Sequence, residues 1–199
     1  MIESEQPNAF ATGRNPKHAA VAVTQGLLQH LPPDQVKGVL AHEFAHIKNR
    51  DILVSSIAAM VAGSISAIAN ILQFSLLFGG DDEDSGPLGL IGTLATIILA
   101  PLAAALLQLA VSRQREYLAD ATGAQLLGRG EPLANALETL ERGAQAVPMS
   151  VNPATASLYA VSPLPRSGVA TLFMTHPPIG ERIRRLRALD DDASIRLVA

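Results

Sequence analysis

The sequence predicts a mainly helical protein of the α+β class, with a small β-sheet and an inserted hairpin of two membrane-spanning helices. Two observations predict the helices: uncharged apolar runs at 52–78 and 88–111, and helical spacing of apolar residues from position 33 onward. A third predicts the sheet, because residues alternate in polarity around 10–12 and 20–24 between Pro, Gly and Asn turn signals. We expect 1–51 and 112–199 to be two parts of one folded domain, with the hairpin 52–111 between them.

The composition excludes several classes of protein. Of the 199 residues, 48% are hydrophobic and only 17% are charged, which is incompatible with disorder along the whole chain. Cysteine is absent, which excludes disulfide bonds, cysteine-ligated zinc and a thiol nucleophile. The net charge of −3 gives no overall positive field, so we expect no nucleic acid among the partners.

The two uncharged runs contain 27 and 24 residues, and each exceeds the roughly 20 residues that cross a bilayer. An acidic turn at 79–87 joins them. None of the fifteen Lys and Arg residues lies between Arg50 and Arg113, so the positive-inside rule places both open ends in the cytoplasm. Small residues recur every four positions in both runs, and this spacing lets helices approach closely in lipid. They are Ala59, Gly63 and Ala67 in the first run and Gly92, Thr96, Ala100 and Ala104 in the second.

A long helical hairpin buried inside a soluble protein is the alternative. Serine and amide side chains dilute the first run, Pro101 interrupts the second, and the chain has no Trp for an interfacial belt. The membrane interpretation is favoured over this alternative because of the length of both runs and the distribution of basic residues.

The rest of the chain is predicted to be mostly helical. Two short strands in residues 1–30 form a hairpin, and Pro33 with Asp34 marks the start of a helix. No stop signal precedes Ile52, so we expect this helix to continue into the first apolar arm. Further helices are expected at 112–127, at 131–145 and from Pro178 to about Leu189, with a loop at 148–169 that contains one strand at 157–161.

The first of these helices carries His42-Glu43-Phe44-Ala45-His46. Histidines four residues apart share one helical face, so both imidazoles can bind one zinc ion. Glu43 lies where its carboxylate can take a proton from a water molecule next to the metal. The alternative interpretation is a helix with two solvated histidines.

A catalytic zinc site needs a third protein ligand, and the predicted candidate is Glu116. Asp120 lies one turn further along the same helix and can accept an imidazole N–H. His46 precedes the first apolar run by six residues and Glu116 follows the second by five, so an antiparallel hairpin places them at similar heights. A solvated helix with mixed charges is the alternative for Glu116 taken alone.

These motifs, together with Thr175-His176-Pro177-Pro178, Arg182 and the stretch Pro7-Asn8-Ala9-Phe10-Ala11-Thr12-Gly13, resemble the membrane-embedded zinc metallopeptidases of the HtpX type. That family consists of bacterial relatives of the CAAX prenyl protease. The resemblance covers nearly the whole chain and preserves the order of the motifs. It implies a zincin-like catalytic domain of the gluzincin type, interrupted by the transmembrane hairpin.

The resemblance also implies roles for single residues. His42, His46 and Glu116 would bind one Zn²⁺ per chain, Glu43 would act as general base and then acid, and His176 would assist the oxyanion. Asp120, Asn8 and Arg182 would orient a ligand or contact substrate. A separate interpretation of His176 is that it caps the final helix. The final helix also has a basic face, which is either solvated or in contact with anionic lipid and is formed by Arg182, Arg184, Arg185 and Arg187.

The implied function is a zinc-dependent endopeptidase of the bacterial inner membrane. It would cleave misfolded or damaged membrane proteins on the cytoplasmic side, as part of protein quality control and the stress response. Polypeptide substrates and the lipid bilayer are the expected partners. A substrate would add as a strand beside residues 8–12.

One departure and two alternatives accompany this expectation. Members of the family begin with two further hydrophobic helices, so this chain is expected to be a form that lacks them. The first alternative is a non-catalytic membrane scaffold whose zinc site is structural or vestigial. The second is a soluble zinc peptidase with a buried hairpin.

Overall fold

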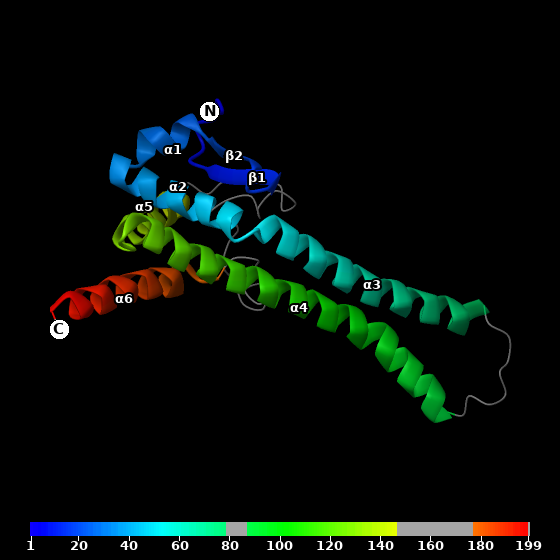
Figure 1. Cartoon of the computed structure of the whole chain (residues 1–199). Coiled ribbons are helices and arrows are strands. Elements are labelled where there is room, and N and C mark those ends of the chain that lie inside the picture. The colour runs from blue at the N-terminus through cyan, green and yellow to red at the C-terminus, as the bar shows by residue number, and fades with distance from the viewer. Residues whose placement is uncertain (79–86, 147–176, 199) are drawn as a thin grey trace. The chain divides into compact units, whose positions relative to one another are not determined.

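The computed structural model describes residues 1–78, 87–146 and 177–198. The expected mainly helical class with a small sheet is confirmed. Figure 1 shows the elements in chain order. The strands are β1 (Ala9–Asn15) and β2 (His18–Val23), and the helices are α1 (Gln25–His30), α2 (Pro33–Lys48), α3 (Asp51–Phe78), α4 (Pro87–Leu127), α5 (Glu131–Ala146) and α6 (Ile179–Val198).

The contacts divide the chain into two compact units. The first unit contains residues 1–53 and 112–199, and the second contains residues 54–111. The two stretches of the first unit are thus folded together although the apolar arms separate them in sequence.

Strands β1 and β2 form an antiparallel hairpin in which Ala9 is opposite Val23 and Ala11 is opposite Val21. Thr24 donates its N–H to the Asn8 carbonyl at 3.0 Å, which fixes the hydrogen-bonded positions of this pair. Because such positions alternate along an antiparallel ladder, the main-chain groups of Ala9, Ala11 and Gly13 point away from β2. The outer edge of β1 is therefore formed by these three residues, and β1 packs against α2.

The break between α2 and α3 corrects one expectation. The helix does not continue into the first apolar arm, because it ends at Lys48 and the chain turns through Asn49 and Arg50 before α3 begins at Asp51. Arg50 has a φ of 56°, in the left-handed region that a helix cannot contain. Asp51 then supplies a negative charge to the first turn of α3, which favours a new helix N-terminus there.

Other boundaries differ by smaller amounts. Helix α1 was not expected; Thr24 caps it, accepting a hydrogen bond from the Leu27 N–H. Helix α4 continues through Pro101, and Gly128, with a φ of 76°, follows its end as expected. Helix α6 continues beyond Leu189 to Val198. The predicted loop at 148–169 and its strand at 157–161 lie outside the described residues.

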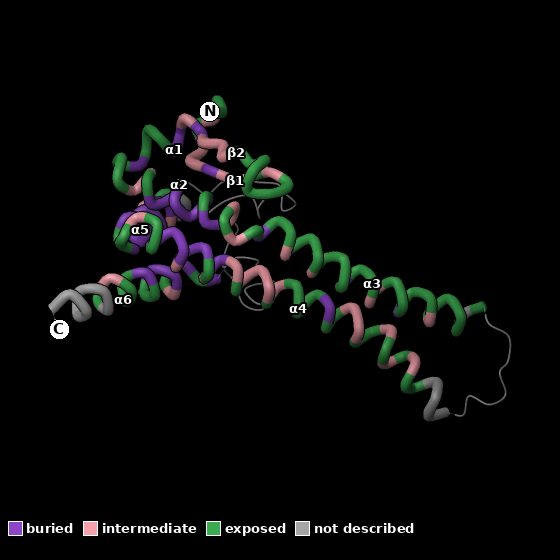
Figure 2. Tube along the Cα trace, viewed as in Figure 1, coloured by how far each residue is buried: buried purple, intermediate pink, exposed green. Residues whose placement is uncertain are grey.

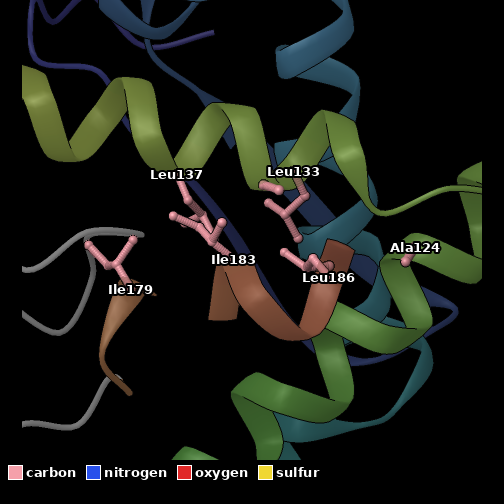
Figure 3. Packing of buried hydrophobic residues seen from close by; sticks show 7 residues of the cluster. Ala124, Leu133, Leu137, Ile179, Ile183 and Leu186 are labelled. Carbon is pink, nitrogen blue, oxygen red and sulfur yellow. The ribbon is translucent and has the colours of Figure 1, made fainter. Parts of the chain in front are cut away.

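Helix α5 connects the two buried apolar clusters of the first unit. One cluster joins α5 to α4 and α6, and Figure 3 shows its labelled side chains. It consists of Leu133, Ala134 and Leu137 of α5, Ala124 of α4, and Ile179, Ile183 and Leu186 of α6. Ala136 and Leu140 of α5 pack with Ala9, Leu27, Leu31 and Val39. Apolar residues three and four positions apart thus let one short helix join α2, α4 and α6.

Close packing holds α2 against its neighbours. A Cβ atom on Gly38 would lie only 2.5 Å from the Leu133 main-chain nitrogen, so α5 can pass this closely only because position 38 is glycine. At Gly123 of α4 the approach is less close, since a Cβ there would lie 3.1 Å from the His42 nitrogen and would require only a small shift. The two glycines bring α5 and α4 onto the helix that carries the histidines.

In the second unit most of the large apolar side chains that the structure describes are exposed. The small residues expected at a close helix contact are mostly exposed too, since Ala59, Gly63, Ala67, Gly92 and Thr96 lie at the surface of this unit. Ala62, Ala69 and Ala104 are buried, whereas Met60, Ile71 and most of their large neighbours are exposed (Figure 2). Two helical stretches, Asp51–Leu76 and Ile91–Leu127, are long and apolar enough to cross a membrane, and only 11% and 6% of their most apolar windows are buried. A buried core hairpin would hide its large apolar side chains, so this pattern favours the membrane interpretation.

Candidate metal centre

Two histidines on one face of α2 begin the site. Pro33 in the first turn and Asp34 near the helix N-terminus start α2, and the helix reaches Lys48 without interruption. His42 and His46 are one turn apart, and their Nε2 atoms lie 3.1 Å from each other. His42 is buried and His46 is half-buried, so neither is the freely solvated histidine of the alternative interpretation.

Glu116 of α4 completes the cluster. Its Oε1 lies 3.6 Å from His46 Nε2 and its Oε2 lies 3.8 Å from His42 Nε2. The three side chains place one ligand atom each within 4.8 Å of one another. The fold thus brings together, from positions 70 residues apart in sequence, the three residues that the sequence predicted as a ligand set.

Each histidine directs its other ring nitrogen at a carboxylate. His42 Nδ1 lies 3.0 Å from Asp120 Oδ1, and His46 Nδ1 lies 2.6 Å from Asp51 Oδ2. A proton on each Nδ1 would face these carboxylates and leave each Nε2 as an acceptor, and Arg182 Nη2 lies 3.5 Å from Nε2 of His42. The structure places Asp120 where the sequence predicted a carboxylate partner for an imidazole.

Asp51 was not among the site residues predicted from the sequence. The signal was present, because Asp51 is the last charged residue before the first apolar run and follows His46 by five positions. Its Oδ1 is bound by Arg115, which also donates to the Asn49 carbonyl at 2.7 Å. The contact between Asp51 and Arg115 could not be predicted from local spacing, because the two residues are 64 positions apart.

The residues present fit a tetrahedral zinc ion. Two imidazole lone pairs and a carboxylate oxygen converge here, which is unfavourable unless a cation lies between them. In a tetrahedral site with bonds of about 2.0–2.1 Å, ligand atoms lie roughly 3.3–3.4 Å apart. The separations of 3.1, 3.6 and 3.8 Å are close to that value. A His₂Glu set leaves a fourth position open, which is typical of catalytic zinc.

Arg182 of α6 supports the carboxylates from behind. Its side chain is only 1% exposed, and it donates to Asp120 from Nε at 2.8 Å and from Nη2 at 2.7 Å. Its Nη1 lies 3.4 Å from Glu116 Oε2. Burial alone would lower the pKa of the Arg182 guanidinium, but the Asp120 and Glu116 carboxylates hold the pKa above its ordinary value. Arg182 therefore remains a cation that orients two acidic side chains.

Glu43 lies between the two histidines in sequence and contacts the outer edge of β1. Ala11 donates its N–H to Glu43 Oε2 at 2.9 Å, and the Glu43 side chain is buried. Burial raises the pKa of this carboxyl above its ordinary value, and the neighbouring His42 and His46 offset only part of that rise. A carboxyl with a raised pKa next to a candidate metal site is suited to accept and return a proton.

Two predicted site residues are placed less directly. Asn8 lies immediately before β1, where its N–H donates to Thr24 Oγ1 at 2.8 Å and its carbonyl accepts from Thr24. Asn8 thus precedes the strand that contains Ala11, and its contact with a substrate stays a prediction. His176 lies outside the described residues.

Comparison with known proteins identifies the family. The sequence pattern of peptidase family M48 matches residues 1–190. The chain belongs to peptidase family M48. The family implies a bound metal, and the His42, His46 and Glu116 cluster is the candidate site for it in this M48 chain.

Two relatives described as protease HtpX homologs illustrate the likeness. The one from Persephonella marina is 58% identical over 190 residues, which cover 94% of this chain and 66% of that protein. The one from Syntrophobacter fumaroxidans is 56% identical over 194 residues, which cover 95% of this chain and 68% of that protein. This M48 chain thus spans about two thirds of the length of such relatives.

A solved structure shares the fold. The crystal structure of S. mikatae Ste24p matches with a TM-score of 0.57 and 23% identity, over 92% of this chain and 42% of that one. The resemblance to HtpX-type peptidases that the motifs indicated is confirmed by these relatives.

Proposed function

We propose that this M48 chain is a zinc-dependent endopeptidase embedded in a membrane through the α3–α4 hairpin. The convergence of His42, His46 and Glu116, with carboxylates on both outer imidazole nitrogens, carries this proposal. His42, His46 and Glu116 would hold one Zn²⁺, which supplies a Lewis acid for the scissile carbonyl and makes a nearby water more acidic. The family membership supports hydrolysis of peptide bonds as the reaction.

The chain's own groups then have separate tasks. Glu43 takes the proton of the attacking water and returns it to the leaving amine. Asp120 and Asp51 keep each imidazole in the tautomer that presents Nε2 to the metal. Arg182 holds Asp120 and Glu116 in place, and His176 donates a hydrogen bond to the developing oxyanion.

The outer edge of β1 is the proposed place for the substrate main chain. The Ala11 N–H already donates to Glu43, so an extended polypeptide would pair with Ala9, Gly13 and the Ala11 carbonyl. Such a polypeptide is recognised mainly through its backbone, so binding tolerates many sequences. That breadth suits the removal of misfolded or damaged membrane proteins. Asn8, at the start of this edge, would contact the same substrate.

The distribution of basic residues supports a cytoplasmic active site. Lys48 and Arg50 precede the first arm and Arg113 and Arg115 follow the second, whereas the turn at 79–87 is acidic. We place the chain in the bacterial inner membrane on this basis and on its likeness to the bacterial HtpX homologs.

Metal content and proteolysis of the detergent-purified chain test the proposal together. After mild chelation and zinc repletion, the wild-type chain is expected to hold one zinc, and Glu116→Ala to lose it or bind it far more weakly. Glu138→Ala is the matched control, because Glu138 is a half-buried glutamate that pairs with Arg187 away from the cluster. Glu43→Gln is expected to keep zinc and to lose cleavage of unfolded casein. A folded wild-type chain without zinc would contradict the proposal and favour a non-catalytic scaffold. Equal cleavage by Glu43→Gln and the wild-type chain would contradict the role of Glu43 as the base.

A further inference from the structure

An apolar pocket of about 60 Å³ lies beside His46, inside the unit that contains the candidate metal centre. Its walls come from the end of α2, the start of α3 and the turn between β1 and β2. Ile47, Ile52, Leu53 and Ala19 supply aliphatic lining. Because His46 belongs both to this wall and to the metal centre, a group bound in the pocket lies next to that centre.

The outer edge of β1 leads from Glu43 to the pocket. Ala11 on this edge donates to Glu43, and Gly13, two residues further on, lines the pocket. Two residues of a strand span about 7 Å. Consider a polypeptide that is paired with this edge and has its scissile bond next to Glu43. The side chain that it presents to the pocket then belongs to a residue two or three positions from that bond. Antiparallel pairing is the more stable arrangement per residue, and it places this side chain on the N-terminal side of the bond.

The rim of the pocket is positively charged. Arg14 and Arg50 line it, and neither guanidinium forms an ion pair with another residue in the described part of the chain. Asp51 also lines it, but its carboxylate is already engaged by His46 and Arg115. A basic side chain entering this pocket would meet two like charges without a free carboxylate to offset them.

We propose that this pocket is a specificity subsite that takes an aliphatic side chain located two or three residues before the scissile bond, and that Arg14 and Arg50 exclude Lys and Arg there. The proposal rests on the proposed peptidase function and defines its substrate class. The volume sets the size of the occupant. One water needs about 10–15 Å³ measured in this way, so 60 Å³ holds four to six non-hydrogen atoms, which corresponds to Leu, Ile or Met and is too small for Trp.

Mapping of cleavage sites tests the size preference. The zinc-loaded full chain is incubated with unfolded casein, and the products are identified by mass spectrometry. We expect Leu, Ile and Met to be enriched about tenfold over Ala at a single position, two or three residues before the cleaved bond. The reason is that partial burial of three additional carbon atoms lowers the binding free energy by roughly the amount that corresponds to a tenfold preference. Leu53→Phe fills the pocket and should shift this position toward Ala and Gly.

A matched variant separates the pocket from general effects on α3. Ile57→Phe introduces the same ring one turn further along α3, at a residue that is also about half exposed but does not line the pocket. It should leave the cleavage profile unchanged. For the rim, Arg14→Glu should admit Lys at this position, whereas Lys17→Glu, with the same change of charge in the adjacent turn, should not.

A binding measurement tests the pocket without cleavage. Fluorescent peptides with a single Leu, and matched peptides with Ala or Lys in its place, are titrated into the zinc-loaded Glu43→Gln chain. We expect the Leu peptide to bind about tenfold more tightly than the other two, and Leu53→Phe but not Ile57→Phe to remove the difference. Equal binding of the three peptides, or a difference that Leu53→Phe leaves intact, would overturn the subsite. Loss of zinc-dependent cleavage with this preference preserved would overturn the peptidase function alone.

Discussion

Asp51 Oδ2 lies 2.6 Å from Nδ1 of His46, and this contact ties the first turn of α3 to the helix that carries both histidines. The carboxylate comes from the residue directly after the left-handed turn at Arg50. A break that interrupts the helix thus also places an acceptor behind one of the candidate metal ligands.

Asp51→Asn is therefore expected to weaken zinc binding by about 10- to 100-fold, since an amide is a poorer partner for the imidazole N–H than a carboxylate. Competition with a chromogenic chelator measures the change. Asp34→Asn is the control, because Asp34 also lies in the first turn of a helix and pairs with Arg129 at the surface. Equal zinc affinity of Asp51→Asn and the wild-type chain would show that this contact does not support the site.

Arg182→Ala should lower the free energy of unfolding by about 3–5 kcal/mol, because it leaves the buried Asp120 carboxylate without its cation. Arg184→Ala removes an exposed pair with Glu181 and should leave the free energy of unfolding nearly unchanged, because solvent screens this pair. Denaturant unfolding of both variants in the same detergent makes the comparison. Similar losses for the two arginines would contradict the assignment of Arg182 as the buried support of the carboxylates.

Glu43→Gln should stabilise the metal-free chain at neutral and higher pH. Burial raises the pKa of Glu43 above its ordinary value of 4.5, so the folded state holds the proton more tightly than the unfolded state. The wild-type chain loses stability as pH rises through the raised pKa, by about 1.4 kcal/mol for each pKa unit between the two states, whereas Gln cannot ionise. The difference in melting temperature should shrink toward pH 4, and a difference that grows on acidification would have the wrong sign.

Leu137→Ala should cost about 2–5 kcal/mol, because Leu137 is only 1% exposed and lies in the cluster formed by α4, α5 and α6. Leu189→Ala, at a position of α6 that is 40% exposed, should change stability by less than about 1 kcal/mol. Thermal unfolding of the metal-free chain checks both values, without interference from zinc binding.

The sequence was informative where function depends on short spacing. The sequence has two histidines four residues apart, a carboxylate after the second apolar run and a second carboxylate one turn later. This spacing predicted one cluster of His42, His46, Glu116 and Asp120, and the structure brings these residues together. The two strands and the start of α2 were also predicted, since their turn and capping residues act locally.

The remaining features depend on contacts between distant residues. The break at Arg50 has no glycine or proline to mark it, and it is compensated by Arg115, which binds Asp51 and the Asn49 carbonyl. The burial of Arg182 is equally invisible in a run of four arginines, because only the packing of α6 on α5 decides which of them is enclosed. Helix propensity and periodicity do not contain this information.

The position of Glu116 after both apolar arms has a consequence for the synthesis of the protein. A ribosome that has translated the chain as far as Phe78 has produced His42, Glu43 and His46 but not the third ligand, and Arg182 is added later still. In the proposed membrane topology, the nascent chain completes its metal site only after the second arm has been made. Under the proposed function, the centre would therefore lack its third ligand until the second arm has been translated.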